Sequence, residues 1–144
     1  MGFFDWLKSW FKEEPPKSPL EWAEKRQKAV EAISYHEKRS QELLERAKVD
    51  KSFRSEYYKE RLAHLENKSV SVAGRLFWLT RLSKAQKKDH TKRFLDLLQD
   101  LSTAEDPNVR KLREVEFRKL EDEIENMLKL DAERIRIEHA EYLT

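Results

Sequence analysis

Very few residues in this chain can interrupt a helix. The two glycines are Gly2 and Gly74, and the four prolines stand at positions 15, 16, 19 and 107. Because glycine and proline are the residues that most often mark turns, their scarcity predicts a small number of long elements. Ala, Glu, Lys, Arg and Leu make up more than half of the 144 residues, a composition typical of long helices and coiled coils. We therefore expect an all-α fold.

The first 13 residues predict a short amphipathic helix. At about 100° per residue, all the large apolar side chains of this stretch fall on one arc of the helix and the polar ones on the other. The predicted membrane or partner anchor consists of Phe3, Phe4, Trp6, Leu7, Trp10 and Phe11. So short a helix is marginally stable alone in water, so we expect its apolar face to contact another surface. A Pro-rich spacer over 14–18 follows.

The main helical region is expected to span 19–144 as one bundle, and it opens with three agreeing signals. Ser18 suits the N-cap of a helix, Pro19 its first turn, and Glu21 the third position of a capping box. The apolar stripe continues to about residue 66. The stretch 50–53 weakens the pattern without a glycine or proline, so the sequence is compatible with one helix over 19–66 or with two helices joined at a kink.

Two further helices are expected after a turn over 67–74. The second covers about 75–101, with a leucine stripe along one face. The third covers about 107–143, and Asp106 and Pro107 suit its N-cap and first position. Long antiparallel helices forming an elongated three-helix bundle or a coiled-coil hairpin, with the short N-terminal amphipathic helix, are the predicted architecture.

The segment 68–93 is strongly basic, with eight Lys and Arg residues against Asp89 alone. On a helical wheel most of these cations lie opposite the leucine stripe, with Phe77 among them and Trp78 at the margin, so both aromatics are expected to face outward. The predicted contacts to an anionic surface are Arg75, Phe77, Trp78, Arg81, Lys84, Lys87, Lys88 and Lys92. The open alternative is that another helix or a second protomer covers this face, with Lys and Arg stems shielding the aromatics.

Recognisable catalytic chemistry is absent from the sequence. The chain has no cysteine, its four histidines lack metal-ligand spacing, and two glycines cannot build a phosphate-binding loop. We therefore predict no enzyme activity, no metal, no cofactor and no small-molecule substrate. The sequence also lacks an apolar run of transmembrane length and a signal-peptide pattern. A cytoplasmic protein, peripheral at the inner membrane face when bound, is the expectation.

A short amphipathic leader before a long helical hairpin resembles the phage-shock-protein A group of membrane-remodelling proteins. The resemblance is one of architecture. Those proteins carry a Glu-Asp-Pro run directly after the leader, whereas here Glu105, Asp106 and Pro107 lie late in the chain. No functional residue is carried across.

These observations predict a non-enzymatic peripheral membrane or complex-assembly scaffold. The leader would anchor the chain, and the basic helical face would contact an anionic surface. One alternative is a nucleic-acid-binding helical module that uses the 68–93 segment. Another is an accessory subunit whose leader docks in a groove of a protein partner, and a homo-oligomer is also open.

Overall fold

The fold is taken from a computed structural model that describes residues 16–144. In this part of the chain every regular element is a helix and no strand is present, so the predicted all-α class is confirmed. The predicted anchor helix over 1–13 lies outside the described residues, as do residues 14 and 15 of the predicted spacer over 14–18.

The first described helix, α2 (Pro19–Val49), begins where its local signals predicted. The Ser18 side chain accepts a hydrogen bond from the Glu21 backbone N–H at 3.2 Å, and proline stands in the first turn. A capping side chain supplies an acceptor for one of the backbone N–H groups that the first turn leaves unpaired. The helix ends at Asp50, whose backbone is extended.

The chain then reverses direction, instead of continuing as one helix or as two helices with a kink. A 3₁₀ turn, η1 (Lys51–Phe53), leads into α3 (Arg54–Glu66). The Asp50 carboxylate accepts from the backbone N–H of Ser52 at 3.0 Å, which starts a new helical turn without glycine or proline.

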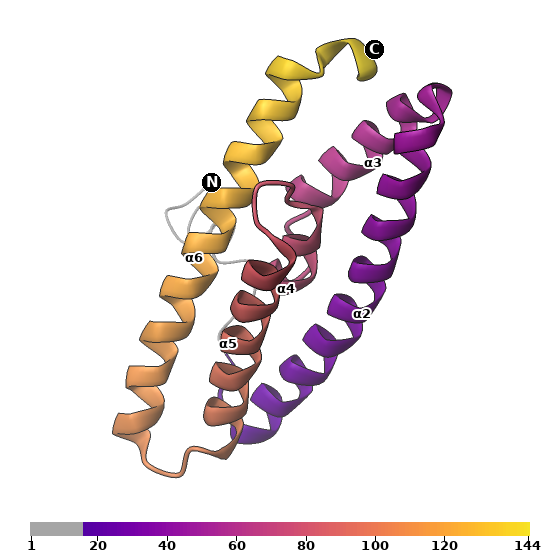
Figure 1. Cartoon of the computed structure of the whole chain (residues 1–144). Helices are drawn as coiled ribbons and strands as arrows, with labels where there is room; N and C mark the ends of the chain where they lie inside the picture. Colours follow the sequence, from indigo (N-terminus) through magenta and orange to yellow (C-terminus); the bar gives the residue numbers. More distant parts are fainter. Residues whose placement is uncertain (1–15) are drawn as a thin grey trace.

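The reversal makes α2 and α3 antiparallel neighbours. Arg39 of α2 pairs with Glu60 of α3 at 3.2 Å, although 21 residues separate them. His36 lies beside His64, with ring centroids 5.0 Å apart. The prediction of a single element over 19–66 was therefore wrong in topology, and Figure 1 shows the two helices meeting at one end of the molecule.

The predicted second helix was wrong over its first nine residues. The turn after α3 gives way at Val72 to a short helix, α4 (Val72–Arg75), and then to a 3₁₀ turn, η2 (Leu76–Trp78). The long helix α5 (Lys84–Thr103) starts only after a loop. It starts there because Ser83 and Gln86 form a capping box, with hydrogen bonds of 3.1 and 2.8 Å.

The last long helix, α6 (Pro107–Glu138), confirms its predicted start. Asp106 accepts from the Asn108 backbone N–H at 2.8 Å, and Pro107 occupies the first turn. A 3₁₀ turn, η3 (Ala140–Tyr142), follows His139, so the helix is a few residues shorter than predicted.

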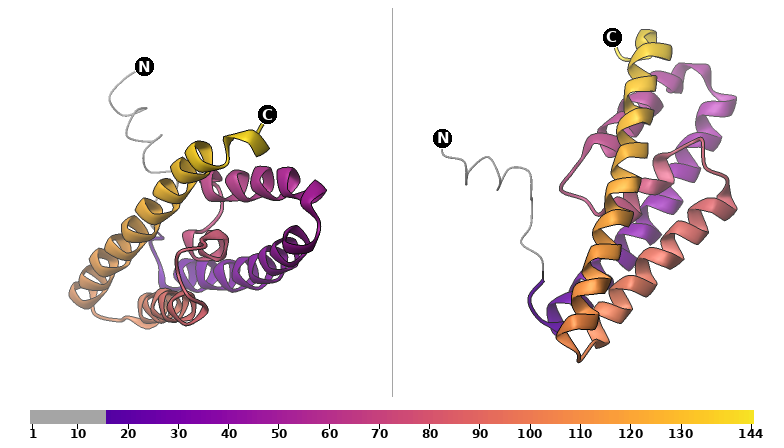
Figure 2. Two further views of the ribbon diagram at one scale, coloured as in Figure 1. Left: turned by 45° about the horizontal axis from the view of Figure 1, so that its top comes forward. Right: turned by 90° about the vertical axis from the view of Figure 1, so that its left-hand side faces the viewer.

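The five α-helices of residues 16–144 pack around one core, with α4 and η2 in the centre. In Figures 1 and 2, α5 lies along both α2 and α6, while α3 lies along the other half of α6. Trp22 meets Phe117 edge to face at 5.5 Å, and Phe94 lies 5.0 Å from Phe117. Burial of such rings is the main favourable term in folding. The predicted three-helix bundle or coiled-coil hairpin is not confirmed, because α4 and η2 also pack against the long helices in the core.

Candidate functional site

The structure divides the predicted anionic-surface contacts into three groups. Four of them are exposed: Arg81 in the loop before α5, and Lys84, Lys88 and Lys92 on α5. We call these four residues the α5 basic face. Phe77 and Lys87 are half-buried, whereas Arg75 and Trp78 are buried. The predicted anchor residues Phe3, Phe4, Trp6, Leu7, Trp10 and Phe11 lie outside the described residues.

Arg75 is a structural residue, so its predicted role at the surface is wrong. It is 1 % exposed and donates from Nε to the backbone oxygen of His64 at 3.0 Å. It also donates to the backbone oxygen of Leu65, and its Nη1 pairs with Glu125 at 2.8 Å. The guanidinium thus satisfies carbonyls at the end of α3 that the helix leaves unpaired and joins them to α6.

Trp78 also faces inward, contrary to the predicted outward orientation. Its indole N–H donates to Nδ1 of His36 at 2.9 Å, and its ring stacks on His64 at a centroid distance of 4.3 Å. The alternative that another helix covers part of the basic segment is correct here, because α2 and α3 supply these two histidines. Helical periodicity failed because residues 76–83 do not continue the α5 helix.

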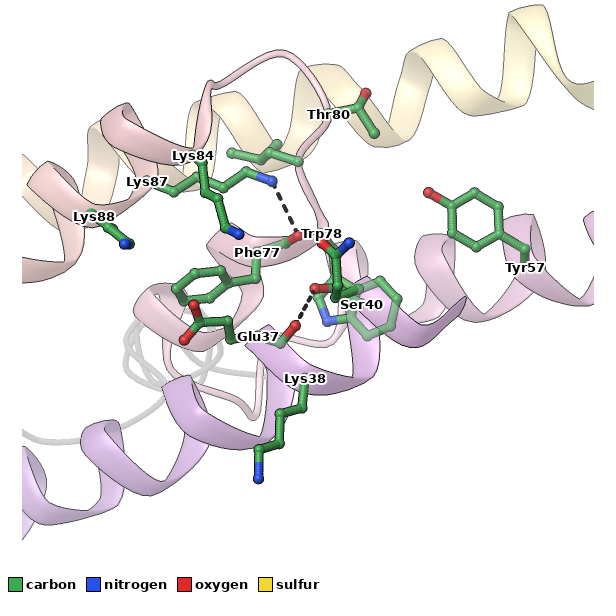
Figure 3. Close-up of a pocket in the computed structure, with 12 residues that line it drawn as sticks. Glu37, Lys38, Ser40, Tyr57, Phe77, Trp78, Thr80, Lys84, Lys87 and Lys88 are labelled. Carbon is green, nitrogen blue, oxygen red and sulfur yellow. Dashed lines mark hydrogen bonds between the residues drawn. The ribbon is translucent and has the colours of Figure 1, made fainter. Parts of the chain in front are cut away.

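A pocket of about 450 Å³ opens between the middle of α2 and the start of α5. Phe77, Trp78 and Leu79 provide its apolar lining (Figure 3). Its polar lining consists of Glu37, Lys38, Ser40, Gln41, Tyr57, Thr80, Lys84, Lys87 and Lys88. Four of these twelve residues are lysines and one is a carboxylic acid, so the pocket carries an excess of positive charge.

Lys84 and Lys87 extend over Phe77 in the pocket, whereas Lys38 extends away from it (Figure 3). The Lys87 ammonium donates to the Phe77 backbone oxygen at 3.3 Å. Burial lowers the pKa of Lys87, the neighbouring Arg61 cation lowers it further, and Asp131 acts in the opposite direction. No described carboxylate forms an ion pair with Lys84, Lys87 or Lys88.

A second pocket of about 340 Å³ adjoins the first along α2 and α5. The two share Glu37, Phe77 and Lys88, so together they form a continuous groove between these helices. Ile33 and Leu95 contribute apolar surface to the second pocket. We call this feature the α2–α5 groove.

A buried ion pair holds the wall of the pocket, and sequence reasoning missed it. Arg61 of α3 forms an ion pair with Asp131 of α6, 70 residues away, and both are less than 5 % exposed. The same guanidinium donates to the Trp78 backbone oxygen at 2.7 Å and to Thr80 Oγ1 at 3.1 Å. These bonds fix the loop before α5. No local sequence signal marks the pair, since each residue lies in an ordinary charged helix.

The surroundings favour the neutral forms of His36, which is buried, and of His64, which is half-buried. Burial lowers the pKa of His36 to about 4, and the nearby His64 and Arg75 contribute in the same direction. Burial also lowers the pKa of His64, which Glu60 partly opposes. Over residues 16–144 no cluster of three or more His, Asp or Glu side chains has the arrangement of a metal site.

None of the described helices has an apolar stretch long enough to cross a bilayer. Comparison with known proteins gives no assignment, because no family model, no curated protein and no solved structure is significantly similar to this chain. The architectural resemblance to the phage-shock-protein A group therefore carries no further argument.

Proposed function

We propose that this protein is a non-enzymatic scaffold that binds an anionic membrane surface. The observation that carries the proposal is the α5 basic face. Lys84, Lys88 and Lys92 are spaced four residues apart, so they project from one side of α5, and Arg81 precedes them in the loop. Cations near an anionic leaflet contribute about 1 kcal/mol each. Four such residues would support reversible association.

The N-terminal leader would supply the second anchoring signal. Its sequence places large aromatic side chains on one arc, which is typical of helices that lie in the membrane interface. Apolar burial and electrostatic attraction add in such anchors, and two weak signals together give stable binding where one does not. The packed bundle would then remain in water as a platform for partners.

Co-flotation with vesicles tests the proposal. We expect the full chain to float with vesicles rich in anionic lipid at low salt and to dissociate as salt is raised, because screening weakens surface electrostatics. The triple variant K84E/K88E/K92E should lose most of this binding. The matched control K111E/K119E/K129E changes three exposed lysines of α6 and alters net charge equally. Equal loss in both variants, or no flotation of the wild type, would refute the proposal.

The leader is tested separately on the same vesicles. Replacement of Trp6 and Phe11 by Glu should weaken binding to anionic vesicles and abolish the part that survives high salt, because that part depends on apolar burial. Unchanged flotation of this variant would exclude the leader as an anchor.

The nucleic-acid alternative has weaker support. Modules that bind single strands stack bases on exposed aromatic rings, and Trp78 is buried. Binding to a subunit partner remains a prediction, which sizing of the purified chain by light scattering would address.

A further inference from the structure

The 450 Å³ pocket at the start of α5 combines an apolar floor with cationic side chains above it. Figure 3 shows the amino groups of Lys84 and Lys87 directed toward the space over Phe77. Pockets that hold small ligands likewise combine apolar surface with polar groups that converge on the ligand. The volume is in the range of such sites, about 300–1,000 Å³.

Lys87 has capacity to bind an anion. Its ammonium carries three N–H donors, of which one contacts the Phe77 backbone oxygen. It forms no ion pair within the described residues, although burial opposes its charge. An anion in the pocket would stabilise the charged form of this side chain.

The protein itself provides little negative charge here. Glu37 is the single carboxylate of the pocket, and it pairs with neither Lys84 nor Lys87. The first turn of α5 contains no acidic residue. Cations at the N-terminal end of a helix are disfavoured by its dipole, whereas anions are favoured. Lysines at the first and fourth positions of α5 therefore oppose the helix dipole, and a negative ligand between them would reduce this repulsion.

We propose that this pocket binds a phosphate monoester, with the phosphate between Lys84 and Lys87 and the organic group over Phe77 and Leu79. A phosphate monoester matches the two-lysine arrangement because it carries close to two negative charges at neutral pH. Its organic part would cover the exposed portion of the Phe77 ring. This inference goes beyond membrane association, because it assigns a defined ligand to one pocket. A soluble ester and a lipid headgroup would present the same phosphate group to that pocket.

Calorimetric titration of the full chain with phenyl phosphate tests the pocket. We expect phenyl phosphate to bind about tenfold more tightly than inorganic phosphate or phenol, a difference of about 1.4 kcal/mol. K87Q should weaken phenyl phosphate binding by about tenfold. The matched control K129Q changes an exposed lysine of α6 that lines neither pocket, and it should bind as the wild type does. Phe77→Ala should remove the preference over inorganic phosphate.

The results that would overturn the proposal are specific. They are phenyl phosphate binding no tighter than inorganic phosphate, or equal binding of phenyl phosphate by K87Q and K129Q. A thermal melt of K87Q checks its fold, and Phe77→Ala tests the site in its place if that fold is lost. Titration with monomeric dihexanoyl phosphatidic acid and with glycerol 3-phosphate distinguishes a lipid headgroup from a soluble ester as the natural ligand. Tighter binding of phosphatidic acid assigns a lipid headgroup, and tighter binding of glycerol 3-phosphate assigns a soluble ester. Binding of neither compound contradicts the site. K87Q should still float with anionic vesicles, so the pocket and the membrane proposal fail separately.

Discussion

The indole N–H of Trp78 donates to Nδ1 of His36 at 2.9 Å, which joins the floor of the pocket to α2. A ring nitrogen can accept this bond only when it carries no proton. The hydrogen bond therefore requires neutral His36. Protonation of His36 would break this bond and would weaken the packing of its ring against the His64 ring, and both contacts lie at the centre of the fold.

Folding stability should decrease as the pH falls from about 6.5 to about 4. The pKa of His36 is about 4 in the folded chain and 6.5 as its ordinary value, so the unfolded chain binds more protons within this window. The contribution of His36 to the free energy of unfolding is fully present above pH 6.5. It decreases as the pH falls from 6.5 to 4, by on the order of 3 kcal/mol in total. Urea unfolding at several pH values measures the slope.

The variant His36→Asn separates this effect from the titration of carboxylates. Asparagine has a side-chain oxygen near the position of Nδ1 and does not titrate, so the slope between pH 6.5 and 4.5 should become shallower. An identical slope in both proteins would show that His36 does not control acid stability.

Gly74→Ala should destabilise the protein. A Cβ atom at this position would lie 2.9 Å from Cδ2 of His36 and 3.2 Å from Cβ of Ala32. The helix α4 would have to move away from α2, and such overpacking costs about 1–3 kcal/mol. Thermal unfolding followed by circular dichroism is the measurement. A variant more stable than the wild type would mean that the gain in helix propensity outweighs the steric contact.

Asp131→Ala should be among the most damaging single changes. It would leave the Arg61 charge buried without its partner, and breaking a buried pair in this way typically costs about 3–5 kcal/mol. Asp122→Ala on the exposed side of the same helix is the control and should change stability by less than about 0.5 kcal/mol. Chemical denaturation compares the two, and equal effects would contradict the assigned role of the pair.

Ser83→Ala should lower stability by about 1 kcal/mol, because the capping box at the start of α5 would lose its side-chain acceptor. Hydrogen exchange should accelerate in the first turn of α5, where the pocket lysines lie. Ser34→Ala, in the exposed middle of α2, is the control and should be close to neutral. Unaltered exchange in Ser83→Ala would indicate that the cap contributes little.

Local sequence signals predicted the helix starts well where the interacting residues are close in the chain. Ser18 caps Glu21 and Asp106 caps Asn108, so each start depends on residues two or three positions apart. Apolar periodicity was misleading after α3. Leu76 and Leu79 are buried as the stripe predicted, but they reach the core from a 3₁₀ turn and the loop after it, because the central elements are packed on several sides at once.

The sequence by itself determined the helical class, the capped ends of α2 and α6, and a basic segment with few acidic neighbours, since these depend on composition and on contacts within a turn. The tertiary structure decided which cations remain at the surface. Arg75 became a buried partner of Glu125, 50 residues away, while Lys84 stayed exposed. Pairing across such distances depends on how the helices cross. A buried guanidinium is costly unless it is hydrogen-bonded and paired, and helix packing determines which carbonyls and carboxylates lie close enough to bind it.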